Sequence, residues 1–309
     1  MIRPRRAHGA AVPPHSAVPL KGMGMRVFVG GRPSRRLAGA ALGFAILAAA
    51  PEHHSWGEEA AAQSMSRCRF EPAATGKVAK ILDGRDFVLD DGREIRLAGI
   101  EVPPAPRPGE NGDHDRAGAA AAATLERIIA DRPVQIGRGV PDRYGRIVAY
   151  VNVIAEEAPR PVNQAMVATG SARVSVLADT SGCAVELLEA ERMARAARLG
   201  LWANPYYAIV GAESGVALLA ERGHFTIVEG KVVSVRESGS NIYVNFGRRW
   251  SEALTVTISK RNERMFAAAG LAPKTLERRR LRVRGWIEER NGPRIEATRP
   301  EQIEIAERN

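Results

Sequence analysis

Cysteine is scarce in this 309-residue sequence, which contains only Cys68 and Cys183. Their spacing matches no cysteine-based metal motif, so a cysteine-ligated metal module is excluded. In an oxidising compartment the two thiols can pair. A Cys68–Cys183 disulfide and two unrelated buried thiols both remain open at this stage.

The sequence also lacks an apolar run of membrane-spanning length near its N-terminus. The run Leu37–Ala50 has 14 residues, whereas a spanning helix needs about 20. Arg35 and Arg36 precede the run, and small residues that suit signal-peptide cleavage follow at Ala60–Ala62. We therefore expect residues 1–66 to be a leader and the protein to be exported, either periplasmic or secreted. An uncleaved N-terminal membrane anchor and a buried apolar helix are the alternatives.

Acidic residues are outnumbered: Lys and Arg total 45 and Asp and Glu total 35, which gives a net charge of +10. The excess is uneven, at +6 for residues 1–67, −3 for 68–221 and +7 for 222–309. Such a balance favours polyanionic partners, either nucleic acid or an anionic partner in the cell envelope. Because the middle third is slightly acidic, phosphate chemistry there would depend on a few well-placed cations.

Alternating hydrophobic residues and Asp-Gly turns predict two β-rich domains, 68–203 and 222–309, joined by a linker at 204–221. The first domain is expected to be mainly β or α+β, a five-stranded barrel with three helices packed on it. The helices are expected at 113–131, 163–169 and 183–200. The core-facing stripe predicted for the last helix consists of Leu187, Leu188, Ala190, Met193 and Ala197.

The second domain is predicted, from Phe225 onward, to contain three strands, a helix and two strands. That order is typical of a smaller OB-fold barrel, a fold that commonly binds oligonucleotides and also serves as a protein-interaction scaffold. Rings can stack on bases while arginines follow the phosphates. The candidate nucleic-acid contacts of this kind are Arg248, Arg249, Trp250, Arg282 and Arg284. A solvated basic strand edge is the alternative interpretation.

Three segments of the first domain carry a family resemblance. They read "ILDGRDFVL" from Ile81, "RLAGIEVPP" from Arg96 and "DRYGRIVAYV" from Asp142. From about Gly76 to Trp202 the chain resembles the thermonuclease (staphylococcal nuclease-like) family. The resemblance implies an OB-type barrel with three helices. It also implies cleavage of nucleic-acid phosphodiesters with one Ca²⁺ ion, a carboxylate that activates water and two arginines on the phosphate.

The family's catalytic positions are kept in part. Arg96 and Arg146 match the two arginines, and Glu101 matches a metal-binding aspartate. These three residues are the catalytic candidates that the resemblance implies. Arg143 and Tyr144 precede the second arginine and are further candidates for contact with nucleic acid.

Other positions depart from the family. Arg85 stands where the family has a metal-binding aspartate, Asp86 stands where it has a threonine, and Pro104 replaces a glutamate. An arginine in place of an aspartate changes the local charge by about two units, a repulsion of about 4 kcal/mol toward a cation at surface-like dielectric. We therefore expect an eroded metal site and no cofactor. If the activity is retained, Glu101 and Asp86 are the candidate ligands of Ca²⁺.

Several interpretations of this site stay open. Arg96 and Arg146 either bind phosphate or pair with Glu101 and Asp83. Glu110 is a weak replacement for the missing base. The positions of two further family tyrosines hold Val176 and Ala178.

Three functions follow from these alternatives. The first is an exported thermonuclease-family protein with an eroded metal site that binds nucleic acid or another anionic partner. The second is an active Ca²⁺-dependent phosphodiesterase. The third is an envelope protein-interaction module that does not meet nucleic acid.

Overall fold

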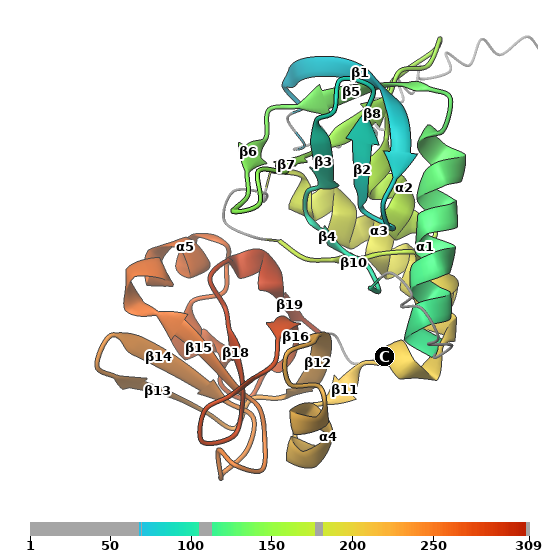
Figure 1. Cartoon of the computed structure of the whole chain (residues 1–309). Coiled ribbons are helices and arrows are strands. Elements are labelled where there is room, and N and C mark those ends of the chain that lie inside the picture. The colour runs from blue at the N-terminus through green and yellow to red at the C-terminus, as the bar shows by residue number, and fades with distance from the viewer. Residues whose placement is uncertain (1–67, 69, 105–112, 177–181, 307–309) are drawn as a thin grey trace, which may run out of the picture. The chain divides into compact units, whose positions relative to one another are not determined.

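A computed structural model describes residues 68, 70–104, 113–176 and 182–306, and residues 61–309 form one compact unit (Figure 1). The expected leader at 1–66, the candidate base Glu110 and Ala178 lie outside the described residues. Within the described part of the chain, no helix combines the length and the apolar composition needed to cross a membrane.

The nuclease-like region, 70–203, is built on a sheet whose strands follow the order β6-β7-β3-β2-β1-β5-β8-β9. Strand β1 pairs with β2 and with β5, and a register shift between Val78 and Lys80 bends it from one partner to the other. The strands are β1 (Pro72–Ile81), β2 (Asp86–Leu89), β3 (Glu94–Leu97), β5 (Pro133–Gly137), β6 (Val140–Pro141), β7 (Ile147–Ala149), β8 (Val151–Val153) and β9 (Arg160–Pro161). The mainly β architecture with few helices confirms the predicted fold class.

Three helices accompany this sheet, as predicted: α1 (Asp113–Ile129), α2 (Val162–Ala168) and α3 (Ala184–Ala196). They enclose one apolar core with the strands, which includes Phe87, Leu97, Leu125, Met166 and Leu187. A small second sheet pairs β4 (Ile100–Glu101) with β10 (Arg173–Val174). It brings Glu101 opposite Arg173, two residues that are far apart in the sequence.

Helix α3 differs from the predicted pattern. Met193 was expected in the core, but its side chain is 65% exposed, and Ala197 is exposed as well. The buried face instead includes Ala194 and Glu191, and Glu191 is fully buried. The prediction is confirmed for Leu187, Leu188 and Ala190. It was wrong for Met193 and Ala197 because it assigned the face from apolar residues alone, whereas a charged residue can be buried when it is paired.

The C-terminal region, 204–306, contains two sheets with strand orders β11-β12-β16-β19 and β13-β14-β15-β18-β17. Its strands are β11 (Val210–Gly211), β12 (Phe225–Lys231), β13 (Ser234–Ser238), β14 (Asn241–Asn245), β15 (Thr255–Ser259), β16 (Arg280–Trp286), β17 (Glu288–Glu289), β18 (Pro293–Glu296) and β19 (Ile303–Ile305). Helix α5 (Glu263–Ala268) lies between β15 and β16, in the expected OB-type order.

The segment expected to be a linker carries regular structure. A 3-10 helix (Pro205–Tyr207), strand β11 and helix α4 (Gly215–Ala220) lie within 204–221. Strand β11 pairs in parallel with β12, so this segment is part of the C-terminal sheet.

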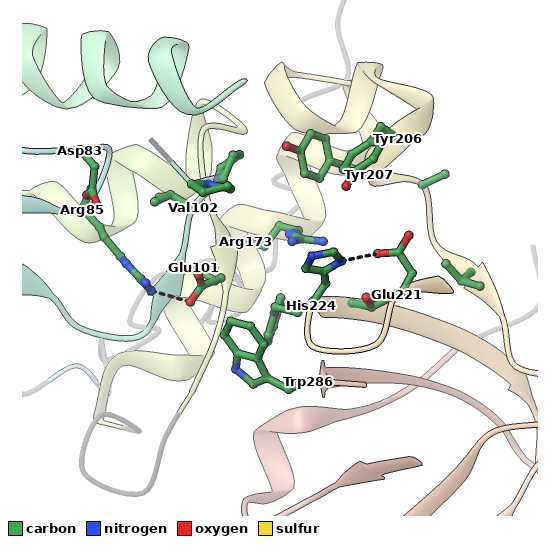
Figure 2. Close-up of a pocket in the computed structure, with 16 residues that line it drawn as sticks. Asp83, Arg85, Glu101, Val102, Arg173, Tyr206, Tyr207, Glu221, His224 and Trp286 are labelled. Atoms are coloured by element: carbon green, nitrogen blue, oxygen red, sulfur yellow. Dashed lines mark hydrogen bonds and ion pairs between the residues drawn. The ribbon is translucent and has the colours of Figure 1, made fainter. Parts of the chain in front are cut away.

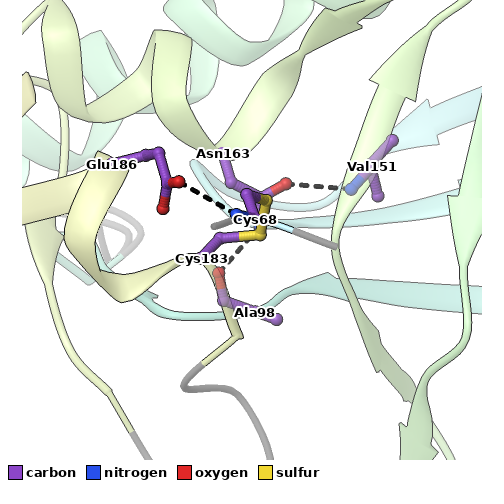
Figure 3. Close-up of a disulfide and its surroundings, with 6 residues drawn as sticks. All are labelled: Cys68, Ala98, Val151, Asn163, Cys183 and Glu186. Carbon is purple, nitrogen blue, oxygen red and sulfur yellow. Dashed lines mark hydrogen bonds between the residues drawn. A yellow bond between two sulfur atoms is a disulfide. The ribbon is translucent and has the colours of Figure 1, made fainter. Parts of the chain in front are cut away.

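A disulfide joins Cys68 to Cys183 across 115 residues of sequence (Figure 3). The backbone N–H of Cys68 donates to Glu186 Oε1 at 2.9 Å. Close by, buried Asn163 accepts a hydrogen bond from the Val151 N–H at 2.9 Å and donates to the Ala98 carbonyl at 2.7 Å. The bridge therefore fixes Cys68 to the start of α3. It lies beside a buried polar contact between α2 and the sheet.

Candidate functional site

The turn before β2 places two neighbouring side chains in different surroundings. Asp83 Oδ1 accepts hydrogen bonds from the backbone N–H groups of Arg85 and Asp86, both at 2.8 Å. An aspartate that caps its own turn in this way is typical of an Asx turn. Strand β2 then begins at Asp86, directly opposite Arg96 on β3.

Arg85 forms an ion pair with Glu101. Its Nη1 lies 2.5 Å from Glu101 Oε2, and the two side chains are 19% and 12% exposed. Burial raises the pKa of the Glu101 carboxyl, although the positive charge of Arg85 acts in the opposite direction. Glu101 and Arg85 occupy the two positions at which the family resemblance implies metal ligands. The carboxylate at the first is therefore paired with a guanidinium at the second.

Asp86 holds both of the arginines that match the family's phosphate-binding positions. Its carboxylate is 3% exposed and accepts two hydrogen bonds from Arg96, from Nε at 2.7 Å and from Nη2 at 2.5 Å. Arg146 Nη1 adds a third at 3.1 Å. The alternative that these arginines pair with Glu101 and Asp83 was wrong in its partners, because Asp86 lies opposite Arg96 on the sheet and its carboxylate also contacts Arg146.

Arg146 is shared between two carboxylates. Besides Asp86, it donates to Asp142 Oδ2 from Nε at 2.8 Å and from Nη2 at 2.7 Å. Desolvation opposes ionisation of Asp142, but the hydrogen bonds from Arg146 and from the backbone bring its pKa below the usual value. Asp86, Glu101 and Asp142 thus each have an arginine partner.

The remaining candidates of the nuclease-like region lie on the surface beside this cluster. Tyr144 is 67% exposed, and the Arg143 and Arg146 guanidinium carbons lie 4.7 and 5.0 Å from its ring centroid. Cation–π contact of this kind orients the ring without burying it.

A second exposed group lies in the loop between β14 and β15 of the C-terminal region. Trp250 is 64% exposed, and Arg248 is exposed beside it. Arg249 Nη1 pairs with Glu252 at 2.8 Å. These residues, together with Arg143 and Tyr144, are accessible to a large anionic ligand.

Two predicted nucleic-acid contacts are placed differently by the structure. Arg284 is 0% exposed; its Nη1 donates to Glu191 Oε2 at 2.7 Å and to the Val174 carbonyl at 3.2 Å, and its Nη2 pairs with Glu304. Arg282 pairs with Glu229 at 2.6 Å and with Glu304 at 3.8 Å. The prediction for Arg284 was wrong, because its side chain, on the face of β16 opposite the core residues Leu281 and Val283, meets Glu191 of α3 and the Val174 carbonyl of β10 instead of solvent.

Sequence reasoning missed the acids of this ionic network. Glu191 also accepts the backbone N–H of Val174 at 2.7 Å, so one buried carboxylate joins α3, β10 and β16. A signal was present, since Glu191 falls at the spacing of the buried positions Leu187 and Ala194. Its charge nevertheless indicated an outward position.

The OB-type sheet, with two arginines that converge on Asp86, defines a nuclease-like domain. In agreement, a family model described as "Staphylococcal nuclease homologue" matches residues 94–204. The chain is 32% identical over 137 residues to "Protein ParB" of Escherichia coli, which covers 42% of this chain and 73% of that protein. It is 33% identical over 135 residues to "Probable endonuclease LCL3" of Verticillium alfalfae, which covers 42% of this chain and 46% of that protein.

The chain belongs to the staphylococcal nuclease homologue family. It spans less than half of the fungal relative. The family model ends at residue 204, so the C-terminal region beyond that residue is not part of the matched segment.

Proposed function

We propose that this protein binds nucleic acid without hydrolysing it, because its own side chains fill the cation and phosphate positions of the family's catalytic site. The observation that carries this proposal is a pair of contacts. Arg85 lies on Glu101 at 2.5 Å, and Asp86 holds both Arg96 and Arg146.

The charges at the family's metal position support this proposal. Ca²⁺ requires six to eight oxygen ligands at about 2.3–2.6 Å, whereas Glu101 and Asp86 direct their oxygens to guanidinium groups. In the described residues no group of three His, Cys, Asp or Glu side chains could hold a metal. The residues present therefore do not fit the family's calcium ion, and Pro104 offers no group that can accept a proton from water.

The phosphate position is filled in a comparable way. Arginine binds carboxylate and phosphate through the same bidentate geometry, and Asp86 presents its two oxygens to two arginines. A substrate phosphate would have to displace this buried carboxylate. We therefore place nucleic-acid contact on the exposed residues Arg143, Tyr144 and Trp250 with their neighbouring arginines, where bases can stack and phosphates can be neutralised.

We expect the full-length protein to bind single-stranded DNA with an affinity that falls steeply as salt is raised, and to leave it intact with or without Ca²⁺. Tyr144→Ala and Trp250→Ala should each weaken binding by about 5- to 100-fold, since a stacked base contributes about 1–3 kcal/mol. Fluorescence anisotropy and gel analysis of the same samples measure both properties. Val216→Ala, at a residue 88% exposed on α4, is the matched control and should change neither.

The second candidate is a divalent-dependent phosphodiesterase, which the word "endonuclease" in the name of the fungal relative favours. Chelator-sensitive cleavage that disappears in Arg96→Ala would establish it and overturn the non-cleaving proposal. Salt-independent binding, or none, would instead favour the third candidate, an envelope protein-interaction module that does not meet nucleic acid.

We also propose that the protein is exported to an oxidising compartment, where the Cys68–Cys183 bridge persists. Protein isolated from its native cells should then resist alkylation of both cysteines until it is reduced. Cys68→Ala/Cys183→Ala should lower the free energy of unfolding by about 2–4 kcal/mol, the usual contribution of a disulfide that closes a long loop. Alkylation without prior reduction would contradict export, whatever the effect on stability.

A further inference from the structure

A cavity of about 450 Å³ opens beside the Arg85–Glu101 pair (Figure 2). Its walls come from the nuclease-like region, through Glu101 and Pro104, and from the C-terminal region, through Phe225 and Trp286. The volume lies within the range of about 300–1,000 Å³ that small-molecule pockets occupy. The family's catalytic residues Arg96 and Arg146 are not among its lining residues.

Arg173 lies in the middle of this cavity wall (Figure 2). Its guanidinium carbon is 5.3 Å from the ring centroid of Tyr207 and 5.2 Å from that of Phe225. Burial lowers the pKa of Arg173, yet an arginine keeps its proton in a protein. Its Nε is buried without a hydrogen-bond partner.

The other charged groups of the wall have neighbours of opposite charge or donors. Arg85 pairs with Glu101 at 2.5 Å, and His224 Nδ1 lies 3.7 Å from Glu221 Oε2. Asp83 accepts two backbone N–H groups. Arg173 differs: of the residues that the structure describes, no carboxylate lies within 4.0 Å of its guanidinium nitrogens, and none accepts a hydrogen bond from them.

From these contacts we infer that the cavity binds a small organic oxyanion, in which a carboxylate or phosphate monoester meets Arg173 and a flat apolar body packs against Trp286 and Phe225. A guanidinium offers paired donors that match either oxyanion. Glu101, which lies opposite Arg173 in the β4–β10 ladder, and Glu221 act on its charge without direct contact, and Glu101 is itself paired with Arg85. A buried donor without an acceptor is costly to keep, and an anionic ligand would supply the acceptor.

The aromatic wall selects the body of the ligand. Trp286 is 48% exposed and packs edge-on against Phe225, with ring centroids 6.2 Å apart. The exposed part of the Trp286 ring is therefore available to a planar ring, which gains from stacked or edge-to-face contact. Inorganic phosphate or acetate alone would satisfy Arg173 and leave this apolar surface uncovered.

Calorimetric titration of the full-length protein with phenyl phosphate, benzoate, inorganic phosphate and acetate tests the inference. At least one aromatic probe should bind saturably and at least about 5-fold more tightly than the matching bare anion, since aromatic contact adds roughly 0.5–1.5 kcal/mol beyond area burial. Comparison of the phosphate arm with the carboxylate arm identifies the oxyanion. Trp286→Ala should remove the aromatic preference while the bare anions keep their affinity.

Arg173→Met is the decisive variant. It should weaken binding of the aromatic probe by about 10- to 100-fold, the usual loss for a hydrogen bond to a charged group, while the melting temperature of the ligand-free protein stays equal or rises. Methionine keeps the contact with the two rings and removes the unpaired charge. Arg192→Gln, at a side chain 64% exposed on α3 and outside the cavity lining, should bind as the unaltered protein does.

Two results would overturn the inference. One is absence of saturable binding of every probe by the unaltered protein. The other is equal binding by Arg173→Met. A fall in melting temperature of that variant together with either result would make Arg173 a purely structural cation. The inference does not depend on the proposed nucleic-acid binding, because DNA affinity and probe affinity are measured separately.

Discussion

Arg284→Met should lower the free energy of unfolding by about 3–5 kcal/mol, the cost of removing one partner from a buried ion pair. Arg284 is 0% exposed, and Glu191 is equally buried. Without the guanidinium, Glu191 loses its partner at 2.7 Å and Glu304 loses its closest cation. Arg195, at 3.5 Å from Glu191, compensates only in part. Urea unfolding followed by circular dichroism measures the loss.

A surface pair provides the matched control for this substitution. Arg222 and Glu289 pair at 2.6 Å with side chains 64% and 48% exposed, so Arg222→Met should cost less than about 1 kcal/mol. Adding Glu191→Gln to Arg284→Met should recover part of the loss, because the buried charge is then removed as well. If the urea midpoint of Arg284→Met equalled that of Arg222→Met, the buried ion pair would contribute little to the free energy of unfolding.

Arg284 also shows where sequence reasoning fails. Strand β16 carries arginines at 280, 282 and 284, and alternation places the three on the same face of the strand. It cannot say whether that face meets water or another element. The answer depends on Glu191, which lies 93 residues earlier in the sequence. The three helices and the OB-type order depend on local patterns, and they were predicted for that reason.

The candidate site shows the same division between local and long-range information. The motifs around Arg96, Arg146 and Glu101 identified these residues as candidates, and the replacement at Arg85 predicted a cationic pocket. The role of Asp86 was not predicted, because it depends on pairing β2 with β3 so that Asp86 faces Arg96. With that register, the two residues that differ from the family act together. Arg85 supplies a cation that pairs with Glu101, and Asp86 supplies an anion that pairs with Arg96 and Arg146.

Arg85→Asp/Asp86→Thr is expected to bind Ca²⁺ more tightly than the unaltered chain does. The first change removes the guanidinium from Glu101 and adds a carboxylate beside it; the second restores the family's residue type and releases Arg96 and Arg146. With Glu101 and Asp83 near the new carboxylate, oxygen ligands replace positive charge at the cation position. We expect a dissociation constant on the order of 10⁻⁴–10⁻³ M, as in weak extracellular sites.

Calorimetric titration measures the Ca²⁺ affinity of the double variant. Its melting temperature should also rise with Ca²⁺, because a ligand at 100 times its dissociation constant stabilises the folded state by about 2.7 kcal/mol. Arg85→Asn/Asp86→Thr is the control, since it removes the same positive charge without adding a ligand oxygen of full charge, and it should bind at least tenfold more weakly. Equal Ca²⁺ binding by the unaltered protein would show that Arg85 yields to the ion, and the non-cleaving proposal would then fail at its electrostatic step. On the non-cleaving proposal, hydrolysis of DNA should stay absent in the double variant, because Pro104 provides no group that can act as the base. Metal binding without cleavage would then separate the change at position 85 from the change at position 104.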